Sequence, residues 1–439
     1  MVSFDQNIIM YLNGLFPHSV IIGRLVEIVY KLIRWIRSMT LIRSLISVMI
    51  VAAMALPAWT ADSYYVSASL GRDRYDGLSP APAGGNHGPF RTIQKAADAA
   101  QRPGDTVIVR DGTYTKPGPD TRRDVVALTH GGSPGAYITF KAENLGRAVI
   151  DGGGAGPNDS SWDTAARSGF VLYNGVGYIV IEGFEIKGLR EFGIYVAYPD
   201  NSYITVRRNH IHHVGNYVSR EVPFSGKAGL FNVARSHNIT LDGNKIHDVG
   251  RTNPPDTGDH GLYMEGTHNT IINNIFDNFP KGWHIQLAGP KVTDFKIANN
   301  TFYGRAGGGD GQIILWDNGG PVEHITISNN ISAAARGCFV RVYRNPFNFR
   351  DIRYRHNVVS APALYNHRWG TTEDQGNLLS TDPKLANPPA DFHLRPGSPC
   401  IGAAYPPDTP DHDYTQVRRA GAAGADVGAY AHISAFPPK

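Results

Sequence analysis

The segments Ile204-Thr-Val-Arg-Arg-Asn209-His-Ile211 and Ile239-Thr-Leu-Asp-Gly-Asn244-Lys-Ile246 share one pattern, in which alternating apolar residues lead to an asparagine and a further apolar residue. The pattern returns four more times, with its asparagine at Asn274, Asn300, Asn330 and Asn357. Successive asparagines are 35, 30, 26, 30 and 27 residues apart. A period in this range predicts a stack of similar coils, because one unit cannot bury its own apolar face and stacked units share a continuous core.

The recurring asparagine is expected at one turn of every coil. An asparagine side chain can bond backbone groups and tolerates left-handed backbone geometry. We therefore expect these residues to form a structural ladder and not to carry out catalysis.

A second element alternates with the first and begins with glycine in most copies. The copies are Gly193-Ile-Tyr-Val196, Gly229-Leu-Phe-Asn232, Gly261-Leu-Tyr-Met264, Gly282-Trp-His-Ile285 and Gly337-Cys-Phe-Val340, with Gln312-Ile-Ile-Leu315 in the equivalent place. No helical pattern lies between the two elements. Each unit is therefore predicted to hold two or three short strands joined by turns.

The ends of the array have their own patterns. Residues 62–134 are predicted to form an N-terminal cap and the first coils, residues 135–380 the repeats, and residues 381–439 a C-terminal cap or tail. Within the first part, Phe90 to Ala100 is predicted to be an amphipathic helix with Thr92 as its N-cap. A strand is expected at Tyr64–Ser69 and another at Thr106–Val109.

Several segments resemble right-handed parallel β-helix proteins of the pectin-lyase-like superfamily. The opening Asp76-Gly77-Leu78-Ser79-Pro80 and Gly104-Asp-Thr-Val-Ile-Val-Arg-Asp-Gly-Thr-Tyr114 resemble their N-terminal cap, and Asp391-Phe-His-Leu-Arg-Pro-Gly-Ser-Pro399 resembles their C-terminal end. The resemblance covers roughly residues 64–431. It implies an all-β solenoid, a single-stranded right-handed parallel β-helix with an N-terminal capping helix. It says much less about activity, because this fold hosts lyases, hydrolases, epimerases and non-catalytic binders.

The first 61 residues are predicted to be a leader. Met39 begins a short basic start, Ser44 to Leu56 is apolar, and small residues near Ala61 suit a cleavage point, so residues 39–61 are expected to be a signal peptide. The apolar run is short for a membrane span. The alternative is that the apolar run is an uncleaved membrane anchor. Residues 1–38 precede the predicted signal peptide and suggest that Met1 lies too far upstream to be the start of translation, with Met39 as the true start. The mature protein is expected to begin near Asp62, to be secreted or periplasmic, and to have no stable membrane insertion.

Charge and cysteine content limit the partners. Residues 1–61 hold five basic and two acidic side chains, so the remaining chain carries a net charge of +1 where the whole chain has +4. This balance does not favour nucleic-acid binding. Cys338 and Cys400 are expected to be two small buried side chains, although export would permit a disulfide. We expect a monomer without an organic cofactor and with a polysaccharide as its partner.

Insertions break the period just before the glycine-led strand, at residues 215–227, 250–258 and 304–309. These loops are expected to flank a groove whose floor is the glycine-led strands. Strand alternation predicts that Tyr263 and Glu265 face outward, and likewise His284 and Gln286, while Trp283 faces the core. Tyr263 and His284 would then share a column on successive coils, about 4.8 Å apart.

Cleavage of a uronate polysaccharide by β-elimination needs a base, a cation beside the carboxylate and an acid for the leaving oxygen. His284 or His260 is the predicted base, Tyr263 the acid, and Arg341 or Lys281 the carboxylate partner. Further substrate contacts are predicted from Glu265, Gln286, Trp316 and Tyr343. Each of these side chains could equally be a cross-strand packing residue or a solvated charge.

A calcium site is a second possibility, because Asp242, Asp248, Asp256, Asp259 and Glu265 lie within two coils and calcium takes six to eight oxygens. Asp256 and Asp259 are the predicted ligands. The signatures of pectate lyases, polygalacturonases and alginate epimerases are absent. The main prediction is a polysaccharide lyase on an acidic glycan. The alternatives are a glycoside hydrolase using Asp256, Asp259 and Glu265, a uronate epimerase, and a non-catalytic carbohydrate binder.

Overall fold

The computed structural model describes residues 60–116, 124–156, 160–173, 175–217, 226–233, 235–251, 258–419 and 424–432, together with residues 27, 28, 31, 32 and 35. The chain divides into two units, residues 1–60 and residues 61–439. In the first unit the described residues are helical, and Lys31 forms an ion pair with Glu27. The predicted signal peptide lies, apart from residues 60 and 61, outside the described residues. Within the described part, no helix is long and apolar enough to cross a membrane.

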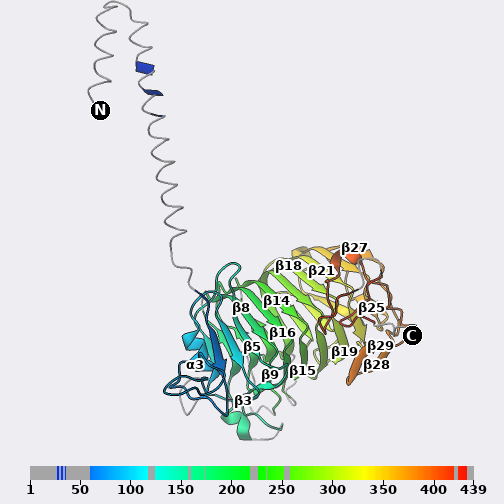
Figure 1. The fold of residues 1–439 in the computed structure, drawn as a ribbon. Helices are drawn as coiled ribbons and strands as arrows, with labels where there is room; N and C mark the ends of the chain where they lie inside the picture. The colour runs from blue at the N-terminus through cyan, green and yellow to red at the C-terminus, as the bar shows by residue number, and fades with distance from the viewer. Residues whose placement is uncertain are drawn as a thin grey trace, which may run out of the picture. The chain divides into compact units, whose positions relative to one another are not determined.

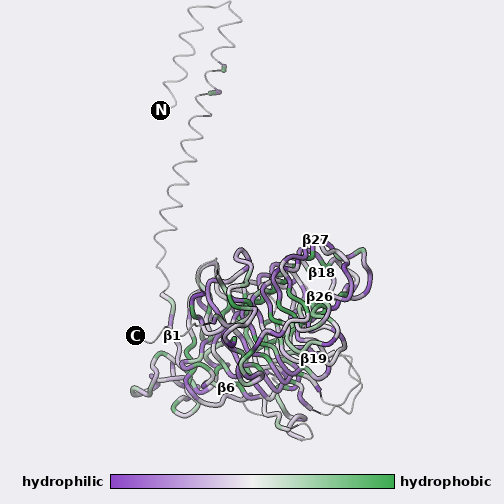
Figure 2. Tube along the Cα trace, turned by 90° about the vertical axis from the view of Figure 1, so that its right-hand side faces the viewer, coloured by the Kyte–Doolittle hydropathy of each residue, from purple (hydrophilic) through white to green (hydrophobic). Residues whose placement is uncertain are grey.

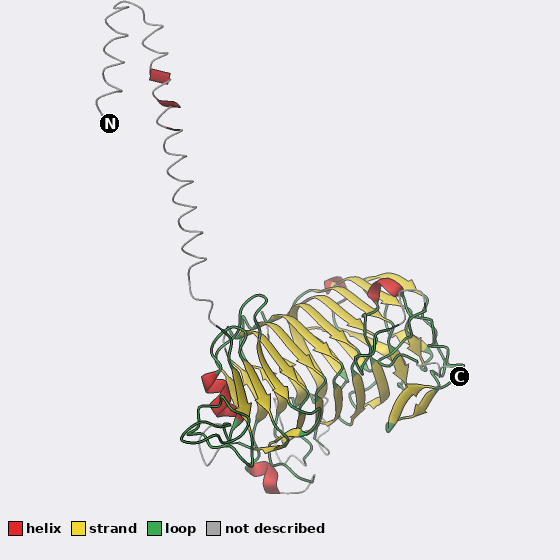
Figure 3. Cartoon of the chain, viewed as in Figure 1, coloured by secondary structure: helices red, strands yellow, loops and turns green. Residues whose placement is uncertain are grey.

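The described strands from β1 to β27 form a parallel β-helix with three strands per coil, and strands dominate the second unit (Figures 1 and 3). We number its three faces in chain order within a coil. Face 1 consists of β4 (Asp124–Leu128), β7 (Ser168–Leu172), β10 (Phe192–Val196), β13 (Ala228–Asn232), the start of β16 (His260–Ile272), the start of β18 (Ile285–Ala298), β20 (Ile313–Asp317), β23 (Cys338–Tyr343) and β26 (Ala363–Tyr365).

Face 2 begins with β1 (Ser63–Val66) and β2 (Thr106–Val109), the two strands expected near the N-terminus. It continues through β5 (Ile138–Ala142), β8 (Gly177–Glu182), β11 (Ser202–Arg207), β14 (His237–Asp242), the ends of β16 and β18, β21 (Val322–Ser328), β24 (Phe349–Arg355) and β27 (Thr371–Gln375).

Face 3 is a separate nine-stranded sheet. Its strands are β3 (Gly112–Tyr114), β6 (Ala148–Asp151), β9 (Glu185–Leu189), β12 (His210–Val214), β15 (Lys245–Val249), β17 (Ile275–Phe279), β19 (Thr301–Ala306), β22 (Ile331–Ala333) and β25 (Val358–Val359). Three short 3-10 turns, η1 (Ser160–Asp163), η2 (Pro346–Asn348) and η3 (Pro406–Asp408), lie in the connections.

Apolar side chains stack in columns along the inside of the helix. On face 2, Val206 pairs with Leu241, Leu241 with Ile271, Ile271 with Ile297 and Ile297 with Ile327, all fully buried. Hydrophobic and hydrophilic residues alternate along the same strands (Figure 2). The period-2 pattern of the repeats therefore becomes one continuous core, as the sequence predicts.

The predicted asparagine ladder is confirmed at the turn between faces 2 and 3. Oδ1 of Asn300 accepts hydrogen bonds from the backbone N–H and from Nδ2 of Asn274, at 2.9 and 3.0 Å. Nδ2 of Asn300 donates to the Ile271 carbonyl at 2.9 Å. The same bonds recur along the ladder, which runs through Asn209, Asn244, Asn274, Asn300, Asn330, Asn357 and Asn377. The left-handed residue is the one before each ladder asparagine, for example Asn299 with φ 54°.

The two ends are closed differently. Helix α3 (Ile93–Ala99) packs near β1, β2 and β4, and the Thr92 hydroxyl caps it by accepting from the Lys95 N–H, so the predicted capping helix is confirmed. At the other end, the hairpin of β28 (Leu385–Asn387) and β29 (Asp391–Leu394) packs against face 3 with the segment that follows it. Cys338 and Cys400 are both buried and unpaired, as expected.

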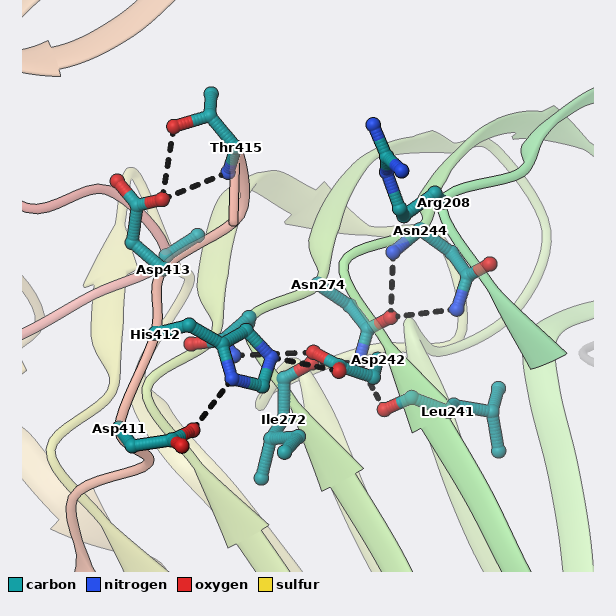
Figure 4. A network of polar contacts seen from close by, with 12 residues as sticks. Arg208, Leu241, Asp242, Asn244, Ile272, Asn274, Asp411, His412, Asp413 and Thr415 are labelled. Carbon is teal, nitrogen blue, oxygen red and sulfur yellow. Dashed lines mark hydrogen bonds and ion pairs between the residues drawn. The ribbon is translucent and has the colours of Figure 1, made fainter. Parts of the chain in front are cut away.

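The C-terminal segment returns along the ladder turn. Asn299 donates to the Asp426 carbonyl, Arg419 donates to Asn273, and Asn329 donates to the Tyr405 carbonyl. His412 bridges Asp411 and Asp242, which binds the segment to β14 (Figure 4). Four successive coils are therefore joined by one returning stretch of chain.

Replacing Asn300 with Ala should lower the free energy of unfolding by about 2–6 kcal/mol. The change leaves the Asn274 N–H and the Ile271 carbonyl buried without partners, and each such group costs about 1–3 kcal/mol. Asn86→Ala, on an exposed loop, is the matched control and should change stability by less than about 0.5 kcal/mol. Urea unfolding of both variants measures the difference. Equal stability of the two would show that the ladder does not hold the coils.

Candidate functional site

The column predicted for Tyr263 and His284 does not exist. Tyr263 pairs with Gln286, and the next partners along the column are Ile314 and Arg341. His284 instead lies one residue before Ile285, opposite Gly261. The outward direction predicted for Tyr263 and Gln286 is confirmed, because the residues that flank them point into the main core: Leu262, Met264, Ile285 and Leu287.

His284 points into the core, so its predicted outward orientation is wrong. Its side chain is fully buried against the rings of Phe279 and Phe302, with centroids 4.7 and 6.0 Å away, and Nε2 donates to the Tyr303 carbonyl at 3.0 Å. A base in this position cannot touch a substrate. The cause is the corner between faces 3 and 1, where two consecutive residues, His284 and Ile285, both turn inward.

Trp283, the residue before His284, also departs from the predicted alternation, but in the opposite direction. It packs with Ala306, Ile314 and Trp316 in a small cluster separate from the main core, and its Nε1 donates to the Asp310 carbonyl. The prediction that Trp283 faces the main core is therefore wrong. Strict alternation fails at this corner and holds again from Ile285 onward.

His260 is on the outer side but is enclosed. Its ring lies between those of Tyr263 and Trp283, at 6.0 and 5.8 Å, and its exposed fraction is 2%. Nδ1 accepts a hydrogen bond from the Trp283 backbone N–H, so the hydrogen of the neutral ring is on Nε2. Burial lowers the pKa of His260 to about 4. The nitrogen that could take a proton is therefore already occupied.

Tyr263 remains a protonated phenol over the working pH range. Burial, and then the charge of Glu265, raise its pKa to about 12, while the hydrogen bond with Gln286 opposes the shift. Its ring stacks on Phe231 with centroids 4.7 Å apart. Tyr263 is thus one member of an aromatic column on the outside of face 1, which begins at Tyr195.

Arg341 is too far from Tyr263 to act on the same sugar. Arg341 and Tyr343 face outward as predicted, with the guanidinium 5.5 Å from the Tyr343 ring centroid. The strands of Tyr263 and Arg341 are three coils apart, or about 14 Å at about 4.8 Å per coil. Lys281 is half-buried in the turn after β17. The structure therefore does not assemble the predicted set of catalytic residues.

Asp259 is committed to a structural ion pair. It is fully buried, and its two oxygens accept from the Arg251 backbone N–H, Nε and Nη2 and from the Lys227 backbone N–H, at 2.6–2.9 Å. Asp256 lies outside the described residues. Asp242 and Asp248 are bonded to His412 and His247. Within the described ranges no three His, Cys, Asp or Glu side chains are grouped as metal ligands.

A different set of polar residues converges where face 3 turns into face 1. We call it the edge cluster; it consists of Arg190, Glu191, Tyr217, Lys227, Arg251 and Asp259. These residues come from three successive turns, after β9, after β12 and after β15. Two of these turns carry the insertions identified in the sequence. That signal pointed to this same corner, but Lys227, Arg251 and Tyr217 were not among the predicted site residues.

The cationic groups of the edge cluster are only partly matched. The Lys227 ammonium lies 3.7 Å from a Glu191 oxygen, and the side chain is 5% exposed. Nη1 of Arg251 is buried and has no hydrogen-bond partner in the part of the chain that the structure describes. Tyr217 is hydrogen-bonded to Arg190 and half-buried. The cluster thus holds three cations against two carboxylates, Glu191 and Asp259.

Burial sets the proton affinities in this cluster. It lowers the pKa of Lys227, the charges of Arg251 and Arg190 lower it further, and Glu191 and Asp259 partly oppose the shift. Burial raises the pKa of Tyr217, although the Arg190 hydrogen bond opposes this. The same cluster thus holds a lysine that loses its proton more readily than usual and a tyrosine that holds its proton more tightly. Two titratable groups shifted apart in this way suit a base and an acid.

These features define a right-handed parallel β-helix of the pectin-lyase-like fold, and the predicted fold class is confirmed. Residues 158–332 match the family described as the right-handed beta helix region. The chain is 29% identical over 120 residues to pectate lyase L of Dickeya chrysanthemi and 30% identical over 120 residues to pectate lyase L of Dickeya dadantii (strain 3937). Each match covers 27% of this chain and 27% of the relative, so the chain spans about a quarter of the length of these relatives.

The solved structure of pectate lyase Pel9A is similar over 85% of this chain and 97% of its own, with a TM-score of 0.51 and 18% sequence identity. Together these likenesses identify a polysaccharide-lyase-like fold.

The buried imidazole of His284 should make the protein sensitive to acid. Burial lowers its pKa to about 4 from the ordinary 6.5, so the unfolded chain binds a proton more readily than the folded one between these values. Stability is therefore full above about pH 6.5 and falls as the pH drops toward 4. His284→Gln, which resembles Gln312 in the next coil, should flatten this fall. Thermal unfolding at pH 7 and pH 5 measures it; an unchanged slope would mean that His284 does not titrate.

Proposed function

We propose that the chain is a polysaccharide lyase that cleaves a uronate-containing glycan by β-elimination at the edge cluster. The observation that carries the proposal is Lys227, an almost fully buried lysine with a lowered pKa, beside a buried Arg251 whose Nη1 has no hydrogen-bond partner among the described residues. A buried guanidinium nitrogen without a hydrogen-bond partner is costly in a purely structural ion network. It suits a site where a substrate carboxylate supplies the missing partner.

In the proposed reaction, the neutral amine of Lys227 takes the proton from the carbon beside the uronate carboxylate. Arg251 and Arg190 offset the negative charge that builds on the carboxylate. A carbon–carbon double bond forms as the bond to the glycosidic oxygen breaks, and Tyr217 gives its proton to that leaving oxygen. The products are a chain with an unsaturated uronate at its end and a chain with a free hydroxyl.

A hydrolase is less well supported by the described residues. Hydrolysis of glycosides commonly uses two carboxyl groups that flank the bond. Both carboxylate oxygens of Asp259 are bonded to Arg251. Of the three carboxyl groups predicted for a hydrolase, this leaves Glu265 among the described residues. An epimerase would share the proton abstraction and release no new chain ends, and a binder would retain glycan unchanged. We also propose export to the periplasm or medium, on the pattern of residues 39–61.

The protein is incubated separately with polygalacturonate, with alginate and with a neutral glucan. We expect it to release unsaturated uronates from an acidic glycan, and their ultraviolet absorbance measures the reaction. Lys227→Met should lower kcat by about 10²–10⁴-fold, the usual contribution of a general base. Lys296→Met is the matched control, because Lys296 on β18 is also partly buried with a lowered pKa but lies on face 2. Reducing ends without unsaturation would indicate a hydrolase, and binding without any product a binder. Parallel assays with calcium and with a chelator test the metal requirement.

The rate should rise with pH through the pKa of Lys227. Only the neutral amine accepts a proton, so activity increases as the ammonium is lost, and burial places this step below the ordinary value of 10.5. A profile of kcat/KM against pH for the wild-type protein measures the rising limb. If the limb stays in place in Lys227→Met, another group is the base.

A further inference from the structure

Four side chains on face 1 form a compact arginine–aromatic cluster, which consists of Trp316, Arg341, Tyr343 and Arg344. The rings of Trp316 and Tyr343 meet edge to face, with centroids 5.8 Å apart. The Arg341 guanidinium lies 5.5 Å from the Tyr343 centroid and the Arg344 guanidinium 5.9 Å from that of Trp316. Two cations are thus held against two rings on neighbouring strands, β20 and β23.

The donors of this cluster are largely unused. Nε of Arg341 and Nε1 of Trp316 are buried, and neither has a hydrogen-bond partner among the residues that the structure describes. Arg344 makes a single 3.5 Å contact with Oδ1 of Asn318, which is an amide. Across the described ranges, neither arginine has an Asp or Glu oxygen within 4.0 Å. Arg344 and Tyr343 are exposed, and the exposed fraction of Tyr343 is 43%.

We propose that the arginine–aromatic cluster is a binding subsite for a carboxylated sugar of the glycan chain. Guanidinium groups bind carboxylates bidentately, and aromatic faces and edges pack on the apolar side of sugar rings. The cluster lies four coils from the strand of Lys227, or about 19 Å at about 4.8 Å per coil. It therefore contacts a different sugar from the one that the edge cluster cleaves. This proposal rests on the proposed function for the identity of its ligand, an acidic glycan. It does not depend on how the edge cluster cleaves that glycan.

The experiment measures binding of polygalacturonate and alginate by calorimetry, for the wild-type protein and for Lys227→Met. Fully methyl-esterified polygalacturonate is the ligand control, because it keeps the backbone and loses the charge. Arg341→Gln with Arg344→Gln should weaken binding of the acidic glycan by about 10- to 100-fold and reduce its salt dependence. Arg350→Gln, which breaks an exposed pair with Glu323 on face 2, is the protein control and should bind as the wild type does.

The result separates the subsite from the catalytic proposal. Unchanged affinity in the double variant, equal binding of the methyl ester, or no binding of either acidic glycan by the wild type would each overturn the subsite. Loss of cleavage in Lys227→Met with unchanged affinity supports the edge cluster and leaves the subsite standing. Arg344 is exposed and Arg341 is half-buried outside the main core, so the melting temperature of the double variant should stay close to that of the wild type, which confirms that weaker binding is not unfolding.

Discussion

The asparagine ladder is the interaction on which the rest of the structure depends. Each side chain satisfies a backbone N–H and a backbone carbonyl of the preceding coil, in a turn where these groups are buried. Buried backbone groups without partners are costly, so the turn between faces 2 and 3 cannot change length without breaking several bonds. The ladder therefore sets the register of every coil. The C-terminal segment strengthens this corner further, because Asn273, Asn299 and Asn329, which precede ladder positions, bond to it.

A rigid corner on one side allows variation at another. Among the described residues, the turn from face 3 to face 1 has no ladder, and the insertions of the chain are found there. Asp259 and Arg251 pair within one such turn, and Asp259 also accepts from the Lys227 backbone N–H of the preceding coil at 2.9 Å. The charged residues at this corner can differ from one coil to the next without altering the strand spacing. This corner can therefore carry a chemical site, while the ladder keeps the scaffold unchanged. The lowered pKa of Lys227 follows from the same burial that makes the corner compact.

Face 1 connects the two proposed sites. Its outer column runs from Tyr195 through Phe231, Tyr263, Gln286 and Ile314 to Arg341, at one residue per coil. The regular spacing is a property of the parallel strands and not of the individual side chains. A linear polymer laid along this face meets a similar surface at each step. In the proposed function, specificity then depends on the few positions where a buried donor has no partner among the described residues, at the edge cluster and at the arginine–aromatic cluster.

The sequence by itself determined the architecture. The asparagine period, the alternation of the flanking residues and the Thr92 cap each depend on local chemistry that repeats from coil to coil, so the fold, the ladder and the capping helix could be predicted. The outward direction of Tyr263 and Gln286 also followed from alternation. The direction of His284 did not, because two consecutive residues turn inward at the corner before β18, and only the bend of the backbone decides that. The edge cluster was equally hidden, since Arg190, Lys227 and Arg251 belong to different coils and meet only when loops of unequal length close on one corner. Local periodicity specifies a repeating scaffold, but a site built from the exceptions to the repeat is decided by tertiary structure.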